Sequence, residues 1–403
     1  MDDRITGRYE RVTVGGEEVS AFIPAPLPPA APPLVIDERL ADRLRHAEHA
    51  LARLELAGEM VPSLDWFIYA FVRKEAVLSS QIEGTQATLV DLLTFEAEDQ
   101  AAPTADVEEV CNYLDALSFA REQIASDQGL PLSMRLLCET HRRLMAGVRG
   151  ATKQPGEIRR SQNWIGGSRP GNAVFVPPPP QALPELLTAL EKYLHAGPAT
   201  QANFVSVGEA DEELPKLLRA GLAHVQFETI HPFLDGNGRI GRLLVTLLLE
   251  HWGLLAKPLL YLSLFFKRHQ AEYYRRLDAV RTAGDWEGWL DFFLDGVATI
   301  ADEAVASARD LFAVVSTDRA RVLESGTTSV AALRLFEALP RHPIITVASA
   351  MKLIDASKPT ATRAIEALAD TDILAETTGR RRDRSFAYRA YLDRLRVGTE
   401  LST

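Results

Sequence analysis

The sequence is poor in cysteine and lacks the apolar segments that direct a chain into a membrane. Two cysteines among 403 residues, Cys111 and Cys138, exclude a disulfide framework and a cysteine zinc site, and they favour a reducing, cytoplasmic setting. The acidic N-terminus contains no signal core. The longest apolar stretch, residues 243–266, is interrupted by charged residues and a proline, so it predicts buried helices and no membrane span.

An excess of positive charge is also missing. The net charge of -11 argues against a protein coated in nucleic acid or held on an anionic membrane. Hydrophobic residues make up 46% of the chain, which is enough for a globular fold. The length predicts two or three domains, and we find no internal repeat.

Helical periodicity covers most of the chain and predicts a mainly α fold. It extends from residue 35 to about 124 and from 183 to about 311. Glycines and prolines punctuate the region between them, where residues 164–176 predict a β-hairpin with a long loop, the one β element expected in the first 300 residues. The proline-rich residues 24–33 are expected to run extended, as a polyproline II spacer packed on the domain.

The last 75 residues have a different pattern. Helical spacing at 329–339, 345–355 and 359–369 precedes two short strand patterns at 373–378 and 385–388. An arginine-rich turn separates these strands. Three short helices followed by a two-stranded hairpin are typical of a winged-helix domain.

One dodecapeptide carries most of the chemical information. Residues 231–242 read His-Pro-Phe-Leu-Asp-Gly-Asn-Gly-Arg-Ile-Gly-Arg, and an apolar helical run follows directly. Gly236 and Gly238 leave backbone N–H groups accessible before this helix, where the amides and the helix dipole favour an anion. The arrangement predicts a polyphosphate site; the alternative is an ordinary Gly-Asn-Gly turn with surface charges.

The side chains of this segment suit the same chemistry. Asn237 is a neutral donor, while Arg239 and Arg242 lie three residues apart on one helix face and each can bind phosphate as a fork. Asp235 is a hard oxygen ligand of the kind that Mg²⁺ prefers. His231 stands at the start of the loop, where a neutral imidazole can accept a proton near pH 7.

The segment closely resembles the signature of Fic-domain (Fido) proteins, in which every signature position is filled by residues 231–242. The surroundings are also similar to the family: residues 224–230, Tyr261-Leu262-Ser263, residues 272–274, and Asn163-Trp164-Ile165-Gly166-Gly167 in the expected hairpin. The resemblance covers about residues 35–305. It implies a helical Fic core with a β-hairpin flap.

The resemblance further implies transfer of AMP from ATP, with Mg²⁺, to a Ser, Thr or Tyr hydroxyl of a target protein, which can be the protein itself. His231 would be the catalytic base, and Asp235 would hold the metal. The nucleotide would be bound by His231, Gly236, Asn237, Gly238, Arg239, Ile240, Gly241 and Arg242. Tyr273 and Tyr274 match the lining of the base pocket, although plain packing explains them equally well. Arg281 replaces a side-chain amide found in some members, so a preference for adenine is less secure than phosphate binding.

Two further features follow from the resemblance. The flap residues Ile165, Gly166, Gly167, Val174, Phe175 and Val176 would take up the target segment as an added strand. Ser79, Glu83 and Gly84 resemble the end of the family's inhibitory helix, with Ser79 and Glu83 on one helix face and Gly84 as its terminating glycine. Glu83 would pair with Arg242 in the space of the γ-phosphate; the alternative is a solvated surface glutamate.

We therefore expect five regions: a proline-rich arm (1–34), an N-terminal helical region with the inhibitory helix (35–125), a Fic core (126–305), a linker helix (306–327) and a winged helix (328–403). The winged helix would bind DNA or serve dimerisation and target docking, and a homodimer is a candidate assembly. Three alternative functions stay open: a DNA-binding regulator with the Fic core as a sensor, use of another nucleotide donor, and removal of AMP. The target and the signal that relieves inhibition are not encoded in any recognisable motif.

Overall fold

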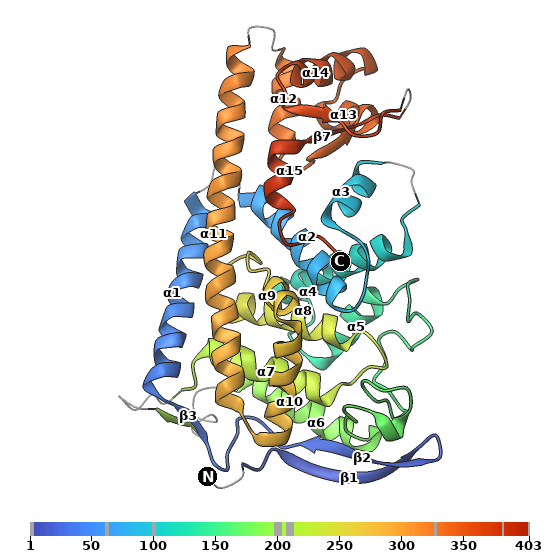
Figure 1. Ribbon diagram of the computed structural model, residues 1–403, viewed down its shortest axis with the longest axis vertical. Helices are drawn as coiled ribbons and strands as arrows, with labels where there is room; N and C mark the ends of the chain where they lie inside the picture. Colours follow the sequence, from blue (N-terminus) through green and yellow to red (C-terminus); the bar gives the residue numbers. More distant parts are fainter. Residues whose placement is uncertain are drawn as a thin grey trace. The chain divides into compact units, whose positions relative to one another are not determined.

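Helices dominate the computed structural model, as the sequence predicted (Figure 1). It describes residues 4–60, 64–98, 102–196, 204–206, 213–325, 329–380 and 383–401. The chain forms two compact units. The first unit comprises residues 1–52, 112–258 and 265–301, and the second comprises residues 53–111, 259–264 and 302–403.

Two buried helices form the centre of the first unit. These are α7 (Lys216–Ile230) and α8 (Asn237–His251), and every residue from Leu217 to Ile230 is buried. Close packing requires a glycine in α7, because a Cβ on Gly221 would lie 3.0 Å from the ring of Phe293 in the long helix α11 (Trp286–Glu324). The other helices of this unit, in whole or part, are α1 (Glu38–Met60), α4 (Ala105–Ala125), α5 (Met134–Leu144), α6 (Leu183–His195), α9 (Ser263–Arg268) and α10 (Gln270–Ala283).

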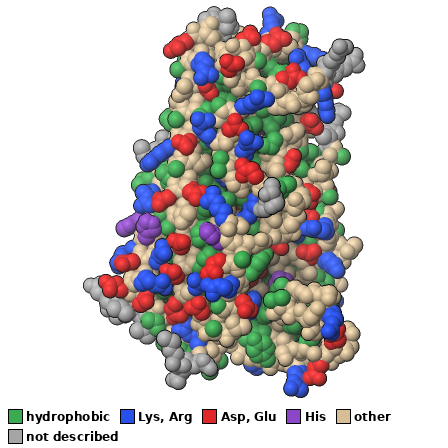
Figure 2. Space-filling view, viewed as in Figure 1, with side chains coloured by type: hydrophobic (Ala, Val, Ile, Leu, Met, Phe, Trp, Pro, Cys, Tyr) green, Lys and Arg blue, Asp and Glu red, His purple; other side chains and the backbone are tan. Residues whose placement is uncertain are grey.

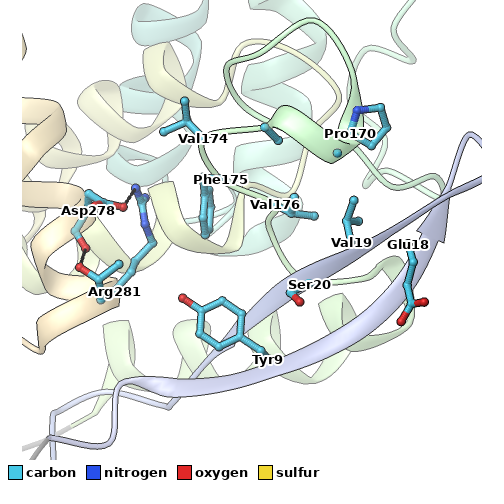
Figure 3. Close-up of a pocket in the computed structure, with 13 residues that line it drawn as sticks. Tyr9, Glu18, Val19, Ser20, Pro170, Val174, Phe175, Val176, Asp278 and Arg281 are labelled. Atoms are coloured by element: carbon cyan, nitrogen blue, oxygen red, sulfur yellow. Dashed lines mark hydrogen bonds and ion pairs between the residues drawn. The ribbon is translucent and has the colours of Figure 1, made fainter.

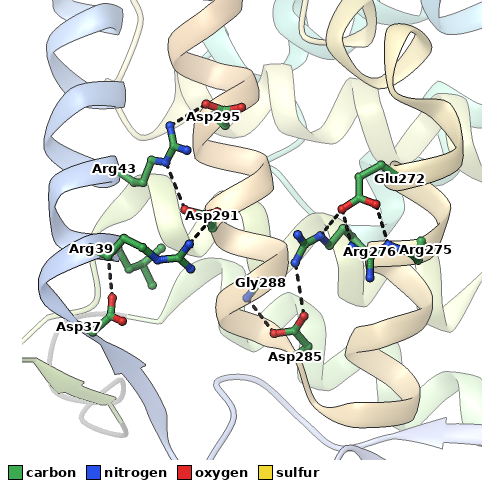
Figure 4. Close-up of polar contacts among 11 residues, drawn as sticks. Asp37, Arg39, Arg43, Glu272, Arg275, Arg276, Asp285, Gly288, Asp291 and Asp295 are labelled. Carbon is green, nitrogen blue, oxygen red and sulfur yellow. Dashed lines mark hydrogen bonds and ion pairs between the residues drawn. The ribbon is translucent and has the colours of Figure 1, made fainter.

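Ion pairs fasten the start of α1 to α11 within this unit (Figure 4). The Arg43 guanidinium lies 3.2 Å from Asp291 and 2.7 Å from Asp295, and Arg39 lies 3.5 Å from Asp291. Helix α11 then continues without interruption through residue 305, where the sequence suggested a domain boundary. The predicted division into five regions stays a prediction.

The N-terminal residues form a β-hairpin that the sequence analysis missed. Strands β1 (Gly7–Val14) and β2 (Glu17–Pro24) pair antiparallel around Gly15 and Gly16, both with positive φ. A two-residue Gly-Gly connection is a recognised hairpin signal. The prediction of a single β element in the first 300 residues was therefore wrong. Strands β3 (Leu34–Ile36) and β4 (Phe204–Ser206) add a short parallel pair.

Two local predictions also need correction. Residues 164–176 do not form two strands; a single bridge joins Ile165 to Phe175, and the loop between them contains the short helix η1 (Pro170–Asn172). A second short helix, η2 (Pro180–Ala182), precedes α6. The proline-rich segment is not a continuous extended arm, because it turns at residues 31–32 and bridges Ala30 to Pro33.

The second unit combines α2 (Leu64–Ile82) and α3 (Leu89–Ala97) with the C-terminal residues. The three predicted C-terminal helices are confirmed as α12 (Val330–Ala338), α13 (Val347–Ile354) and α14 (Lys358–Asp370), and the two strands as β6 (Leu374–Glu376) and β7 (Ser385–Tyr388). Strand β5 (Ile344–Thr346) completes a sheet of order β5-β7-β6, and α15 (Arg389–Leu395) follows. Within the described ranges, no helix is both long and apolar enough to cross a membrane.

Candidate active site

The His231 loop, residues 231–236, connects α7 to α8. His231 ends α7 in the left-handed conformation, with φ 51° and ψ 61°, and its N–H donates to the carbonyl of Phe227 over 2.9 Å. Gly236 is the N-cap of α8 at φ 76°. A glycine adopts this conformation without steric cost and brings no capping side chain, so the first turn of α8 is suited to an anionic ligand.

Asn237 braces this loop. Its Oδ1 accepts from the N–H of Phe233 and its Nδ2 donates to the Phe233 carbonyl, both over 2.8 Å. The side chain is buried, so these bonds are made away from solvent. The amide therefore holds the loop closed, and the predicted contact of Asn237 with phosphate stays a prediction.

The imidazole of His231 is half-buried, and its Nδ1 lies 3.4 Å from the carbonyl oxygen of Glu228. A carbonyl can only accept, so this contact favours the tautomer with the proton on Nδ1 and the lone pair on Nε2. Nε2 is then the atom that can accept a proton from a substrate.

Arg159 is a site residue that the sequence analysis missed. Its Nε donates to the His231 carbonyl over 2.9 Å, and its backbone N–H donates to the Pro232 carbonyl over 2.9 Å. The same guanidinium donates to the carbonyls of Ser161 and Pro178. Burial lowers the pKa of Arg159 to about 10, so the side chain remains a cation at neutral pH.

His141 on α5 supports the other end of the loop. Its Nδ1 accepts from the N–H of Gly156 over 2.8 Å, so Nε2 carries the proton and donates to the carbonyl of Asp235 over 3.0 Å. Its ring stacks on Phe233 with centroids 3.9 Å apart. Burial lowers the pKa of His141 to about 4, so the ring is neutral. A lone histidine in α5 gave no sequence signal of this role.

The predicted phosphate-binding residues gather on the first turns of α8. Gly238 is half-buried, while Arg239, Ile240, Gly241 and Arg242 are buried. A Cβ on Gly241 would lie 2.2 Å from Oε1 of Glu228 on α7, so a larger residue there would require the end of this glutamate side chain to move.

Asp235 is the predicted metal ligand, and its carboxylate stands at the edge of the loop. The side chain is 42% exposed, and one of its oxygens lies 3.8 Å from Arg239. The same oxygen accepts from the N–H of Gly236 over 2.6 Å. In the described part of the chain, no cluster of three His, Cys, Asp or Glu side chains is able to hold a metal by itself.

The two candidate base-pocket tyrosines differ in their surroundings. Tyr273 is 1% exposed, and its hydroxyl lies 2.9 Å from Nε2 of the buried His224. The other ring nitrogen of His224 lies 3.0 Å from the Gly241 carbonyl, so Tyr273 is linked to α8 through this histidine. Tyr274 is 47% exposed. Their predicted role in binding a base stays a prediction.

The flap, predicted as residues 165–176, borders a pocket of about 240 Å³ that it shares with the β1–β2 hairpin and α10 (Figure 3). Gly166 and Gly167 are exposed and Val174 is 76% exposed, whereas Phe175 and Val176 are buried. The Val176 carbonyl accepts from the N–H of Phe22 in β2 over 2.9 Å. Arg281 lies on the ring of Phe175, 4.0 Å from its centroid, and is 3.3 Å from Asp278.

The predicted inhibitory segment lies at the end of α2 in the second unit. Helix α2 ends at Ile82, one residue earlier than predicted, and Glu83 and Gly84 form a turn. Gly84 has φ +93°, as expected for a terminating glycine. Ser79 is buried and Glu83 is exposed. Because Arg242 belongs to the first unit, its pairing with Glu83 stays a prediction.

Comparison with known families agrees with this geometry. The model of the Fic/DOC family N-terminal region matches residues 41–122, and the model of the Fic/DOC family matches residues 131–249. The chain carries a Fic/DOC N-terminal region and a Fic/DOC domain. The second match contains the whole His231 loop and the start of α8.

Curated relatives and solved structures support the Fic assignment. A protein adenylyltransferase Fic from Drosophila grimshawi is 27% identical over 232 residues, which are 57% of this chain and 42% of the relative. One from Drosophila mojavensis is 26% identical over 284 residues, or 69% and 49%. The chain thus spans less than half the length of these relatives. A Fic family protein from Desulfovibrio desulfuricans G20 matches 89% of this chain and 98% of its own, with TM-score 0.54 and 20% identity, and shows the fold alone.

Proposed function

We propose that this protein transfers AMP from ATP to a hydroxyl side chain of a target protein. The observation that carries the proposal is the His231 loop. This short loop connects the imidazole of His231, a proton acceptor, to the N-terminus of α8. The curated relatives are named protein adenylyltransferases, which agrees with this chemistry. We infer a Ser, Thr or Tyr hydroxyl as the acceptor, in another protein or in the chain itself.

Different residues of the loop and of α8 have different roles in the proposed reaction. The acceptor oxygen attacks the α-phosphorus of ATP as its proton passes to Nε2 of His231. The bond from the α-phosphorus to the bridging oxygen breaks, and pyrophosphate leaves. The amides opening α8, with Arg239 and Arg242, would hold the phosphates and offset the negative charge that develops on them.

Mg²⁺ fits this site only together with a nucleotide. Asp235 offers one half-exposed carboxylate, and Mg²⁺ in phosphate sites uses one or two carboxylates completed by phosphate oxygens and water. When bound, the ion would neutralise charge on the phosphates. Asp235 is the side chain that we propose to hold it.

The flap is the proposed acceptor site. Its glycines are exposed and Val174 projects outward, which leaves this stretch of backbone accessible to an added strand. Pairing through the backbone would place an acceptor hydroxyl by register, largely independently of its sequence.

We further propose that the resting enzyme is inhibited by Glu83, which would pair with Arg242 in the space of the γ-phosphate. Glu83 follows the end of α2, where the helix dipole disfavours a carboxylate and increases the gain from a cation. A charge-assisted pair contributes roughly 1.5–3 kcal/mol. Its loss would raise the competent population roughly tenfold to a hundredfold.

The experiment measures transfer of the label from α-phosphate-labelled ATP to the protein itself or to a lysate. It compares wild type with three variants. We expect Glu83→Gly to label more strongly than wild type, His231→Ala in the Glu83→Gly chain to lose labelling, and His251→Ala, an exposed histidine at the end of α8, to keep it. Equal labelling by wild type and Glu83→Gly would contradict the inhibitory role of Glu83. Undiminished labelling by the His231→Ala variant would contradict the assignment of His231 as the catalytic base.

Competition with unlabelled ATP, GTP, UTP and CTP identifies the donor. Arg281 beside Phe175 in the flap pocket makes this control necessary, since the pocket presents a guanidinium and two carboxylates. Loss of label from a pre-modified target would reveal removal of AMP instead of transfer.

For the C-terminal residues we propose a winged-helix domain, a proposal supported by the sheet order β5-β7-β6 and by the three helices that precede β6 and β7. Lys358 and Arg363 are exposed on α14, so DNA is a second candidate partner, beside protein docking and dimerisation. Retardation of genomic DNA fragments, lost on Lys358→Glu and Arg363→Glu, would support it. A cytoplasmic location rests on the cysteine content alone and stays a prediction.

A further inference from the structure

Arg159 connects two parts of the first unit that have to act together. Its side chain is 2% exposed and sits where the two ends of the flap meet the His231 loop. Nε reaches the His231 carbonyl over 2.9 Å, NH1 reaches Ser161 over 3.3 Å and NH2 reaches Pro178 over 2.6 Å. Ser161 precedes the flap and Pro178 follows it, so one guanidinium touches the segments on both sides of the flap and the end of α7.

The identity of these acceptors is unusual for a buried cation. Every bond is made to a backbone carbonyl, and within the described residues no carboxylate lies within ion-pair distance of Arg159. A buried arginine is normally retained next to an anion, since burial of an unpaired charge is unfavourable. The guanidinium suits this position because its donors leave from three separate nitrogen atoms held in one plane, whereas the three donors of a lysine ammonium leave from one nitrogen.

Two further side chains, Asn163 and Gln162, add hydrogen bonds to the same part of the molecule. Nδ2 of Asn163, just before the flap, donates to the Phe233 carbonyl over 3.2 Å, and Gln162 donates to Pro177 on the other side of the flap over 2.7 Å. Residues 231–233 are therefore bound at three successive carbonyls, by Arg159 at His231 and Pro232 and by Asn163 at Phe233.

We propose that Arg159 is a positioning residue that fixes the flap and the His231 backbone as one rigid body, and so sets the distance from an acceptor on the flap to Nε2 of His231. The inference rests on the proposed function. It assigns Arg159 no contact with ATP, because the side chain is 2% exposed and each of its three nitrogen atoms donates to a backbone carbonyl. An error of about 1 Å in such a distance lowers the rate roughly a hundredfold.

The test uses the full chain carrying Glu83→Gly, with Arg159→Lys and Arg159→Met. Lysine keeps the charge, but its three donors leave from a single nitrogen, so it does not reproduce the three separate positions of the guanidinium nitrogens. We expect kcat for AMP transfer to fall by about tenfold to a hundredfold while the Kd for ATP changes by less than about twofold. The matched control is Arg160→Met, because Arg160 is the next residue, is 84% exposed and pairs only with Glu157 among the described contacts.

Hydrogen exchange provides a readout that does not need activity. In Arg159→Lys we expect faster amide exchange in residues 161–178 and at His231 together, with α10 unchanged and with Arg160→Met unchanged throughout. Should the Glu83→Gly parent show no transfer, the proposed function fails, and exchange still decides the role of Arg159. The proposal is overturned by wild-type exchange in both segments, by wild-type kcat, or by ATP binding that is lost in parallel with transfer. If Arg159→Met does not fold, the lysine variant carries both measurements.

Discussion

Asn237 decides the shape of the His231 loop at the scale of single residues. One amide side chain satisfies both the N–H and the carbonyl of Phe233, four residues earlier, in a buried position. A backbone group that loses such a partner inside the protein is left unsatisfied, which is more costly than the loss of an exposed bond. The residue thus folds the loop before any ligand is bound.

We expect Asn237→Ala to lower the free energy of unfolding by about 1–3 kcal/mol, because the buried N–H of Phe233 loses its acceptor while the Phe233 carbonyl keeps the bond from Asn163. Asn237→Asp keeps the acceptor for the Phe233 N–H, so its loss of unfolding free energy should be roughly half that of the alanine variant. Urea unfolding of the three proteins measures both values. A loss in the alanine variant below about 0.5 kcal/mol, typical of surface substitutions, contradicts the bracing role.

Single residues also show how far the sequence could predict the site. The placement of His231 between two helices followed from helical spacing on both sides and from the glycines of residues 236–238. Arg159 could not be predicted, since its partners are carbonyls of residues distant in the sequence and no motif marks a carbonyl. Asn237 was predicted as a phosphate donor because its hydrogen bonds to the loop are visible only once the loop is folded.

At the scale of elements, two neutral histidines fasten helices to the site. His141 links α5 to the carbonyl of Asp235, and His224 links α7 to the carbonyl of Gly241 and to Tyr273 on α10. Burial lowers the pKa of both imidazoles to about 4. Each therefore stays uncharged in the folded protein in a pH range where an unfolded histidine, with an ordinary pKa near 6.5, takes up a proton.

These depressed pKa values predict acid sensitivity. Between about pH 4 and 6.5 the unfolded chain binds more protons than the folded one, so stability is highest above this range and falls as the pH is lowered through it. His141 alone accounts for about 3 kcal/mol of that loss. We expect His141→Gln to reduce the slope of the unfolding free energy against pH, as measured by urea unfolding at several pH values. The reduction should correspond to at most one proton fewer taken up on unfolding. His46→Gln, an exposed control, should keep the wild-type slope; an unchanged slope in His141→Gln contradicts the assignment.

Secondary structure was predictable where helical periodicity was strong. Helices α7, α8, α12, α13 and α14 were placed correctly, because buried faces repeat every three to four residues. Strand β1 was missed because most of its side chains are exposed, which removes the alternation that identifies a strand. The flap was predicted as two strands, but its loop folds into η1 instead, and Asn172 accepts the backbone N–H groups of Ser168 and Arg169.

At the scale of the molecule, charge is mixed and the functional parts are divided between the two units. Acidic and basic side chains are interspersed over the face that Figure 2 presents, in keeping with a modest net charge of -11. The His231 loop lies in the first unit, whereas Glu83 and the C-terminal elements lie in the second. Within the second unit, the segment that carries Glu83 is bonded directly to the C-terminal residues.

Gln81 makes that bond. Its Nε2 donates to the carbonyl of Thr399 and to that of Ala87, each over 2.8 Å, and so holds the turn at Glu83 from two sides. The other end of α2 is also linked to the C-terminal residues, by an ion pair of Arg341 with Asp65 and by the ring of His342 beside Tyr69. A ligand that displaces the C-terminal residues would therefore act on the proposed inhibitory turn without contacting the active site.

We expect Gln81→Leu to raise AMP transfer several-fold in the chain that retains Glu83, because the turn loses two hydrogen bonds worth about 1 kcal/mol each. In the Glu83→Gly chain the same substitution should have no further effect, since the inhibitory carboxylate is already absent. Labelling from α-phosphate-labelled ATP measures all four combinations, and Gln128→Leu, an exposed glutamine of the first unit, is the control. Equal stimulation by Gln81→Leu with and without Glu83 contradicts a coupling of the C-terminal residues to this inhibitory turn.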